Sequence, residues 1–313
     1  MTEHGNFSDV SATRRAVARL PRSPGVYRFR DAGGRALYIG RATTLRQRVA
    51  SYWADLADRP HLTAMVRRID RIEAVACGSV HEAAWLERNL LETSMPRWNR
   101  TPGGQEVPVY IRMSIAPAAP GLSVTHEVRT NAAVRYFGPY LGGTRVRQAV
   151  VGVERILPLA YAGTRLRGAE LDMARQRGVT EADRVRLVDE IAAVLDREPD
   201  AVDRVRTGLQ RLRDLAAARL GFELAGRVEA EIAALEWITS TQRVTTFEPA
   251  DVEVYGWAAD MLVRYVIRAG RLSEWSQRAC SRPKAAPRLA GTPEAWIEFA
   301  QRNAELAAAL AGR

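Results

Sequence analysis

The sequence is poor in lysine and cysteine, and each scarcity excludes some classes of protein. Lys284 is the only lysine among 46 basic residues, so arginine supplies nearly all of the positive charge. The two cysteines, Cys77 and Cys280, cannot form a disulfide framework or a four-cysteine zinc site. A small secreted scaffold held together by disulfides is therefore excluded.

Long hydrophobic runs and an N-terminal targeting segment are also missing. Arginine or a carboxylate interrupts every apolar run well before the ~18 residues that a membrane-spanning helix requires. The first residues, Met1–Gly5, lack the basic and then apolar build of a signal peptide. We therefore expect a protein of a reducing cytoplasm.

Positive charge is abundant, and it is concentrated in the first half of the chain. The 46 basic residues exceed the 36 acidic residues, which gives a net charge of +10. Residues 111–165 contain seven arginines but only Glu127 and Glu154 as acids. A GC-rich genome would explain arginine in place of lysine, but it does not explain the missing carboxylates. Arginine pairs well with phosphate, so the charge favours nucleic-acid binding.

The length of 313 residues allows two or three domains. Breaks in composition and periodicity predict an α+β multidomain protein with a mostly helical middle region. The predicted parts are a leader (1–20), a small α/β domain (21–105), a connector (106–180), a charged helical region (181–244) and a C-terminal hairpin plus helix (245–313).

The α/β domain begins with a predicted hairpin. Residues 25–30 alternate apolar and polar side chains, residues 31–34 form a turn, and residues 36–40 are the second strand. Later, Ser79 followed by Glu82 matches a capping box, so a helix is expected to start there and to stop before Pro96. A central sheet flanked by helices is the expected architecture.

Several chemistry-bearing side chains fall on these elements. Tyr27 and Tyr38 lie on adjacent strands and could share one face of the sheet. Arg48 and Tyr52 are four residues apart, so a helix would point them in the same direction. Glu87 has mostly small and apolar neighbours at helical spacing, which makes it a candidate metal ligand. Taken singly, each residue has an ordinary structural explanation.

Together these residues resemble the GIY-YIG nuclease family, in the form found in UvrC-like excinuclease subunits and their Cho-like relatives. The resemblance extends from Ser23 to Asn99. It rests on five motifs in order: Gly25-Val26-Tyr27, Tyr38-Ile39-Gly40, Arg48-x-x-x-Tyr52, Leu86-Glu87-x-Asn89-Leu90 and Pro96-Arg97-Trp98-Asn99. One such motif is weak evidence, whereas five at compatible spacing are specific.

The resemblance implies catalytic roles for three of these residues. Tyr38 would be the general base that takes a proton from the attacking water. Arg48 would hold the scissile phosphate and stabilise its developing charge. Glu87 would bind a single divalent cation, Mg²⁺ or Mn²⁺, which fits one carboxylate because Mg²⁺ keeps most of its waters.

The resemblance also implies orienting roles, and the sequence departs from the family at two places. Tyr27, Tyr52 and Asn99 would orient the water, the phosphate and the metal site, although Tyr52 fits a core position equally well. Where relatives carry lysine after the second tyrosine motif, this chain has Arg41. Arginine keeps the positive charge but cannot share a proton in the way that lysine can. Residues 103–108 lack the charged run of relatives.

Three later segments extend the resemblance. Residues 136–140 and 153–159 are similar to the part of UvrC that follows the nuclease, but residues 160–180 contain no cysteine, so no iron–sulfur cluster is expected. Residues 208–236 resemble the UVR motif, a helical hairpin that would turn near Gly221 and that implies a UvrB-like partner. Residues 251–275 resemble only the opening hairpin of the RNase-H-like half of UvrC.

The expected function is therefore metal-dependent cleavage of damaged duplex DNA in nucleotide excision repair, on the 3′ side of a lesion. The resemblance also implies a bacterial cytoplasmic protein that is associated with the nucleoid. Two alternatives stay open. The chain could be a GIY-YIG nuclease of another DNA-processing pathway, which the UVR-like hairpin disfavours. It could also be a non-catalytic adaptor that binds UvrB or DNA, which the presence of Tyr38, Arg48 and Glu87 disfavours.

Overall fold

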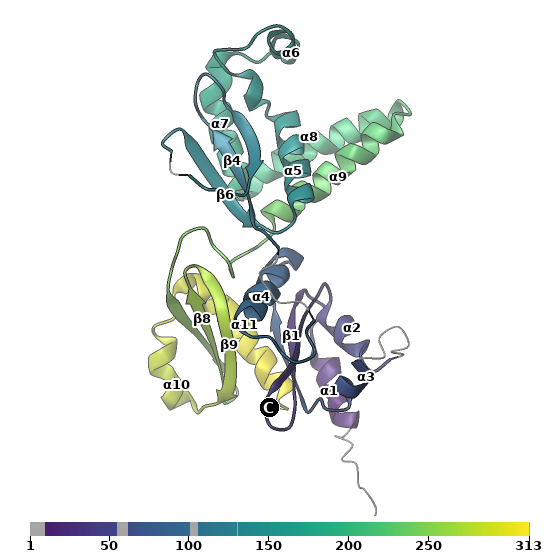
Figure 1. Ribbon diagram of the computed structural model, residues 1–313, viewed down its shortest axis with the longest axis vertical. Coiled ribbons are helices and arrows are strands. Elements are labelled where there is room, and N and C mark those ends of the chain that lie inside the picture. The colour runs from purple at the N-terminus through teal and green to yellow at the C-terminus, as the bar shows by residue number, and fades with distance from the viewer. Residues whose placement is uncertain (1–9, 55–61, 101–105, 130, 313) are drawn as a thin grey trace, which may run out of the picture. The chain divides into compact units, whose positions relative to one another are not determined.

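The chain folds into two compact units by its internal contacts (Figure 1). The computed structural model describes residues 10–54, 62–100, 106–129 and 131–312. Unit 1 comprises Met1–Glu106 and Thr241–Arg313, and unit 2 comprises Val107–Ser240. The mixed helices and antiparallel sheets confirm the predicted α+β class. Among the described residues, no helix combines the length and apolarity needed to cross a membrane.

The first sheet of unit 1 contains the predicted hairpin. Its strands β1 (Gly25–Arg30), β2 (Ala36–Ala42) and β3 (Arg71–Ala76) are all antiparallel, in the order β2-β1-β3. Tyr27 lies opposite Gly40, and Phe29 lies opposite Tyr38. Because these pairs are in register, Tyr27 and Tyr38 do share one face of the sheet, as the alternation predicts.

Four helices accompany this sheet, namely α1 (Val10–Arg19), α2 (Leu45–Ala50), α3 (Thr63–Val66) and α4 (Val80–Thr93). Part of the predicted leader, residues 1–9, and part of the departure at 103–108, residues 103–105, lie outside the described residues. Helix α2 ends at Ala50, so Tyr52, which was expected on the same helix as Arg48, lies in the turn that follows.

The start of α4 follows the predicted cap with one difference. Ser79 Oγ accepts the backbone N–H of Glu82 at 2.9 Å, as a capping box requires. The carboxylate of Glu82, however, accepts the N–H of Gly78 at 2.6 Å and the N–H of Arg243 at 3.0 Å. Glu82 is completely buried, so these hydrogen bonds satisfy a charge that water cannot reach.

A second sheet completes unit 1. It contains β7 (Val252–Ala258), β8 (Met261–Arg268) and β9 (Arg271–Ala279), and it is followed by α10 (Arg282–Leu289) and α11 (Glu294–Leu310). The sequence predicted a hairpin and one helix here. Helix α4 contacts β1 and β9, and α11 contacts β3 and β8, so both helices lie between the two sheets (Figure 1).

Buried polar contacts tie the C-terminal segment to the first sheet. Asn303 accepts the N–H of Ala76 at 2.7 Å and donates to its carbonyl at 3.2 Å, which satisfies the edge of β3. Arg28 on β1 pairs with Glu73 at 2.6 Å, donates to the Trp275 carbonyl and lies 4.1 Å above the Trp275 ring centroid. The residues predicted as separate parts, 21–105 and 245–313, thus belong to one compact unit.

Unit 2 is built on its own three-stranded sheet. Strands β4 (Val109–Ser114), β5 (Gly121–Thr125) and β6 (Val134–Tyr140) pair in the order β5-β4-β6. The remaining elements are helical: α5 (Gly143–Ile156), η2 (Leu159–Tyr161), α6 (Ala169–Arg177), η3 (Glu181–Asp183), α7 (Arg184–Leu195), α8 (Pro199–Ala218) and α9 (Phe222–Thr239).

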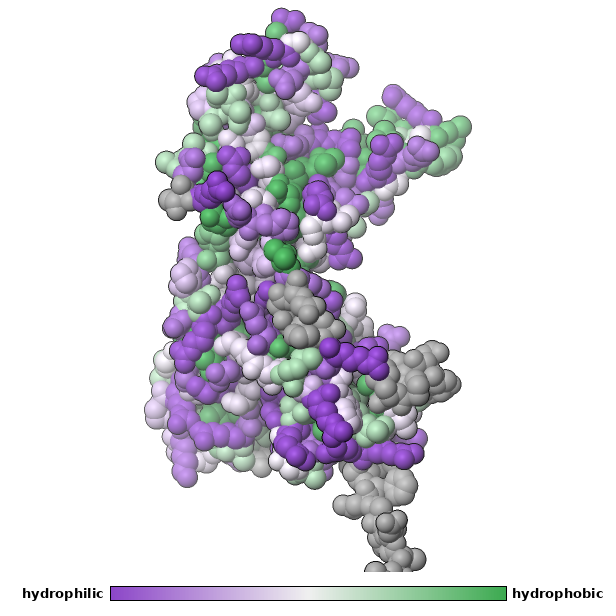
Figure 2. Space-filling view, viewed as in Figure 1, coloured by the Kyte–Doolittle hydropathy of each residue, from purple (hydrophilic) through white to green (hydrophobic). Residues whose placement is uncertain are grey.

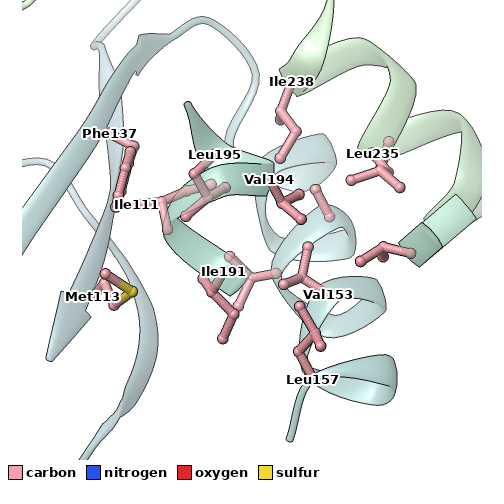
Figure 3. Close-up of a cluster of buried hydrophobic side chains, with 14 of the residues drawn as sticks. Ile111, Met113, Phe137, Val153, Leu157, Ile191, Val194, Leu195, Leu235 and Ile238 are labelled. Atoms are coloured by element: carbon pink, nitrogen blue, oxygen red, sulfur yellow. The ribbon is translucent and has the colours of Figure 1, made fainter. Parts of the chain in front are cut away.

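One hydrophobic core joins the predicted connector and helical region (Figure 3). Ile111 of β4, Val153 of α5 and Ile191 of α7 are each fully buried in it. Arg155 of α5 and Glu231 of α9 form a two-point ion pair at 2.7 and 2.5 Å beside this core. Helix α5 packs against β4 and β5, and α9 packs against α5 and α8, which explains why the two predicted parts form one unit.

Helices α8 and α9 form the helical hairpin predicted for residues 208–236. Leu220 adopts a left-handed φ of 59° and Gly221 follows it, which confirms the predicted turn near Gly221. Apolar side chains at and near this turn are exposed: Leu212, Leu215, Leu220, Phe222 and Leu224.

Candidate active site

A cleft of about 740 Å³ opens on the tyrosine face of the first sheet of unit 1. Four elements and a loop supply its lining: strands β1 and β2, the loop and helix α2 that follow β2, and helix α4. The residues that line it are Tyr27, Tyr38, Arg41, Ala42, Thr43, Thr44, Gln47, Arg48, Ser51, Val80, Ala83 and Glu87. Five of the seven predicted site residues are therefore in one cleft.

Two motif glycines create the space that the cleft requires. A Cβ on Gly40 would lie 2.5 Å from the Tyr27 hydroxyl oxygen and 2.7 Å from a Tyr38 ring carbon. A Cβ on Gly25 would lie 2.3 Å from the Val75 carbonyl oxygen. These distances are far below van der Waals contact, so only glycine permits this packing of the strands and rings.

The three predicted tyrosines form one aromatic cluster. The hydroxyls of Tyr27 and Tyr52 share a hydrogen bond of 2.7 Å, and both side chains are buried, at 0% and 1% exposed. The Tyr38 ring centroid lies 6.1 Å from each of the other two centroids. Tyr38 is only partly buried, so among the three it is the phenol with access to water. Tyr52 is both a core residue and a neighbour of the site.

Arg48 lies in the last turn of α2 and is exposed on the cleft side. Its guanidinium carbon is 5.6 Å from the centroid of the Tyr52 ring, which is within cation–π range. The guanidinium also hydrogen-bonds with the Tyr27 hydroxyl, and its exposed remainder can bind an anion in the cleft. The predicted neighbourhood of Arg48 and Tyr52 therefore exists although α2 ends between them.

Glu87 and Arg41 are in direct contact within the cleft. The backbone N–H of Arg41 donates to Glu87 Oε1 at 3.0 Å, and the Arg41 side chain lies 3.3 Å from Oε2. The Glu87 side chain is 22% exposed, and that of Arg41 is 44% exposed. The residue that replaces the family lysine thus contacts the predicted metal carboxylate directly.

Burial shifts the acid–base behaviour of these groups. It raises the pKa of the Tyr38 phenol, and the neighbouring Tyr52 and Glu87 raise it further, while Arg48 acts in the opposite direction. Burial also raises the pKa of Tyr27, with help from Tyr52 and Tyr38. The pKa of Glu87 is raised by burial, against the lowering effect of Arg41. Tyr38 therefore needs a nearby positive charge to ionise near neutral pH.

Asn99 does not line the cleft, but it holds the strand that does. Its Oδ1 accepts the N–H of Ile39 at 3.0 Å, and its Nδ2 donates to the Ile39 carbonyl at 2.8 Å. These two bonds replace a missing strand neighbour at the outer edge of β2. Ile39 lies between Tyr38 and Gly40, so Asn99 fixes the backbone that carries both motif residues.

Polar residues that the sequence did not single out also belong to the site. Thr43, Thr44, Gln47 and Ser51 line the cleft beside Arg48. Their position in the sequence, directly after the second tyrosine motif, was the signal that could have identified them.

A further motif residue, Asn89, donates to the Val244 carbonyl at 3.2 Å and to the Thr245 hydroxyl at 2.9 Å. These two hydrogen bonds anchor the segment that follows unit 2 in the chain.

The cleft fits a hard divalent cation held by one carboxylate. Glu87 is the only carboxylate among the described residues that line it. Within the described parts of the chain, no group of three or more His, Cys, Asp or Glu side chains is arranged to hold a metal ion. A fully protein-ligated zinc or calcium site is therefore not formed there, whereas Mg²⁺ binds through one or two carboxylates and water.

Comparisons of the sequence with known proteins identify the family. Residues 23–100 match the family model of the UvrC-like GIY-YIG domain. The chain is 34% identical to UvrABC system protein C of Gemmatimonas aurantiaca over 258 residues, which cover 78% of the chain and 41% of that protein. It is 30% identical to the same protein of Mycolicibacterium paratuberculosis over 281 residues, covering 84% and 43%.

A solved structure is also similar in sequence. The magnesium-bound GIY-YIG N-terminal endonuclease domain of UvrC from Thermotoga maritima is 28% identical, with a TM-score of 0.26, and the match covers 32% of this chain and 99% of that domain. The chain spans about two fifths of the length of the curated relatives that it matches. The chain is a UvrC-like member of the GIY-YIG family, and residues 23–100 form its GIY-YIG domain.

Proposed function

We propose that this protein is a metal-dependent DNA endonuclease of nucleotide excision repair, which hydrolyses a phosphodiester on the 3′ side of a lesion. The observation that carries the proposal is the meeting of Tyr38, Arg48 and Glu87 in one cleft. A phenol, a cation and a carboxylate suit the attack of water on a phosphodiester anion. The chain would act on the chromosome in the cytoplasm of a bacterium.

Tyr38 would accept the proton of the attacking water. Its phenol must first lose its own proton, and its raised pKa means that positive charge in the cleft has to support that loss. Arg48 is one such charge, and its exposed guanidinium would also hold the scissile phosphate. A bound Mg²⁺ or Mn²⁺ supplies Lewis-acid polarisation of the phosphate and charge for the departing oxygen. Glu87 is the residue that would hold it.

The remaining site residues would position these groups. Tyr27 and Tyr52, paired through their hydroxyls, would pack Tyr38 in one orientation. Asn99 would hold the peptide of Ile39, and Arg41 would orient the Glu87 carboxylate through its N–H. These residues bring their groups together before the substrate arrives, which lowers the reorganisation needed during reaction.

The α8–α9 hairpin is the proposed contact with a UvrB-like partner. Leu220 and Phe222 at its turn are 75% and 68% exposed, which is unusual for large apolar side chains at the tip of a hairpin. Pairing with an apolar surface of a second protein would cover them. In this proposal the partner supplies lesion recognition and the GIY-YIG domain supplies the cut.

Nicking of a lesion-bearing supercoiled plasmid tests the proposal. Wild type with Mg²⁺ and a UvrB-like protein should convert it to the open-circular form, and Glu87→Gln should lose at least a hundredfold in rate. Glu92→Gln is the matched control, because Glu92 lies on the same helix but pairs with Arg88 and Arg271 away from the cleft. Equal nicking by wild type and Glu87→Gln would contradict the catalytic assignment of Glu87. No nicking by wild type would leave a non-catalytic adaptor as the better explanation.

A further inference from the structure

A second group of cations lies in unit 1 outside the catalytic cleft. Arg278 at the end of β9 and Arg282, Lys284 and Arg288 of α10 are all exposed. From Trp275 to Pro293 the sequence contains these four cations and no Asp or Glu. We call these four residues the basic surface. Figure 2 shows hydrophilic side chains over this part of unit 1.

Two neighbouring hollows make this surface more than a row of separate charges. One hollow of about 770 Å³ is lined by Arg278, Lys284 and Arg288 together with Asp260. A second of about 410 Å³ shares Arg278 and Arg288 with it. The two hollows therefore meet at the same pair of arginines, Arg278 and Arg288.

The acids near these hollows are few, and one of them is engaged elsewhere. Glu253 in the second hollow pairs with Arg264 and accepts the Tyr255 hydroxyl, and these contacts hold its pKa at about 2. Within the described residues, none of the four cations of the basic surface forms an ion pair with a carboxylate. Asp260 is the one acid that faces them in the larger hollow.

Aromatic rings hold two of the cations in place. The guanidinium of Arg282 lies 5.6 Å from the Trp257 ring centroid, and that of Arg288 lies 5.9 Å from the Tyr255 ring centroid. Trp257 is itself fixed by a 2.7 Å hydrogen bond to the Cys280 carbonyl. Stacking limits the motion of a guanidinium without using its N–H donors, which leaves them able to bind phosphate oxygens.

We propose that the basic surface binds the phosphate backbone of duplex DNA outside the catalytic cleft. The proposal rests on the proposed nuclease function, because it assigns the surface to the same substrate. Both the cleft and the basic surface belong to unit 1, so one compact unit would hold the duplex at two places. Contacts to phosphate carry no sequence preference, which suits an enzyme that receives its lesion from a partner.

Lys284 allows a direct test, because it is the only lysine in the chain. An amine-reactive acylating reagent should modify Lys284 rapidly in the free full-length protein, as read from its peptide by mass spectrometry. A 30-base-pair undamaged duplex, at a concentration that fluorescence anisotropy shows to be saturating, should slow that modification at least fivefold. The protection should disappear at high salt.

A triple variant and a matched control give an independent readout. Arg278→Gln/Lys284→Gln/Arg288→Gln should lower the slope of log affinity against log salt by roughly two to three, since each lost phosphate contact removes about one. Arg35→Gln/Arg268→Gln/Arg271→Gln removes the same charge from exposed or half-exposed arginines that already pair with Asp31, Asp251 and Glu92. It should leave the slope near that of wild type.

The outcomes separate the two proposals. Unchanged Lys284 modification in the DNA-bound protein, or equal slopes for the two triple variants, would overturn the basic surface while the nuclease function stood. If wild type bound no duplex and nicked no plasmid, the proposed function itself would fail. Circular dichroism of the triple variant shows whether the fold is kept, which is expected because all three side chains are exposed.

Discussion

Arg41 holds Glu87 at two points: its backbone N–H donates to one carboxylate oxygen at 3.0 Å, and its side chain lies 3.3 Å from the other. The backbone bond would persist with any residue except proline at position 41. The side-chain contact comes from the arginine, and it places a positive charge next to the carboxylate that would hold a metal. Position 41 therefore influences how Glu87 meets a cation.

Metal binding should weaken as the pH falls, from a higher pH than an ordinary glutamate would give. Only the ionised carboxylate binds a cation, and burial raises the pKa of Glu87. Protonation of Glu87 therefore competes with the metal as the pH decreases through that raised pKa. Isothermal titration of Mn²⁺ between pH 5 and 8 checks this. A constant affinity over this range, or binding retained by Glu87→Gln, would contradict the assignment.

The rate of nicking should rise with pH through the neutral and alkaline range. Burial raises the pKa of Tyr38, so its reactive phenolate is a minor form that grows about tenfold per pH unit below that pKa. Single-turnover rates at saturating Mg²⁺ give the profile. Tyr38→Phe should be inactive at every pH. A flat profile for wild type would indicate a different base.

Gly40→Ala should damage both stability and activity. Its Cβ would lie 2.5 Å from the Tyr27 hydroxyl oxygen, so the rings must move, at a cost of about 1–3 kcal/mol in the free energy of unfolding. Gly226→Ala is the control, because Gly226 lies within α9 and a Cβ there meets no atom within 4 Å. It should stabilise the helix by about 0.5–1 kcal/mol. Urea denaturation compares the two variants; equal stability of Gly40→Ala and wild type would refute the packing explanation.

Asn99→Ala should lower the nicking rate while metal affinity stays near that of wild type. Asn99 touches the Ile39 peptide and not the cleft, so its loss loosens β2 under Tyr38 without removing a ligand. A tenfold to hundredfold loss in the maximal rate is expected, in the range seen when a positioning group is lost. Parallel rate and Mn²⁺ titrations make the comparison. If Asn99→Ala instead lost Mn²⁺ affinity while the metal-bound variant kept the wild-type rate, Asn99 would support the metal site and not Tyr38.

Asn303→Ala should destabilise unit 1, although the residue lies more than 200 positions from β3. The change leaves the N–H of Ala76 buried and unpaired, which costs about 1–3 kcal/mol. Gln301→Ala is the control on the same helix, because Gln301 is exposed and bonds only to Glu305 among the described contacts. If both variants unfolded at the same urea concentration as wild type, the C-terminal segment would not support the first sheet.

The sequence predicted what depends on local pattern. Alternation placed Tyr27 and Tyr38 on one face, and turn residues located the hairpin between them, because both features depend on residues close in the chain. The prediction of the tip of the α8–α9 hairpin near Gly221 succeeded for the same reason. The site residues were identified by the resemblance of five ordered motifs to the GIY-YIG family. These motifs lie within about eighty residues of one another.

Contacts between distant segments could not be predicted. Nothing in the pattern around Asn303 or Asn89 indicates that their amides bind Ala76 and Val244, since such bonds exist only after the two sheets pack around α4 and α11. The same applies to Arg28, a strand arginine by sequence, which is buried between Glu73 and Trp275. The burial of a charged side chain can be predicted only when its partner is known.

A double-mutant cycle on the single-turnover nicking rate tests most directly whether Tyr38 and Glu87 serve one catalytic site. Wild type, Tyr38→Phe, Glu87→Gln and the double variant are compared with Mg²⁺ and lesion-bearing plasmid. When two residues act as a unit, replacing either one removes the contribution of both. The double variant should therefore be no slower than the slower single variant. Losses that multiply would contradict a single shared site.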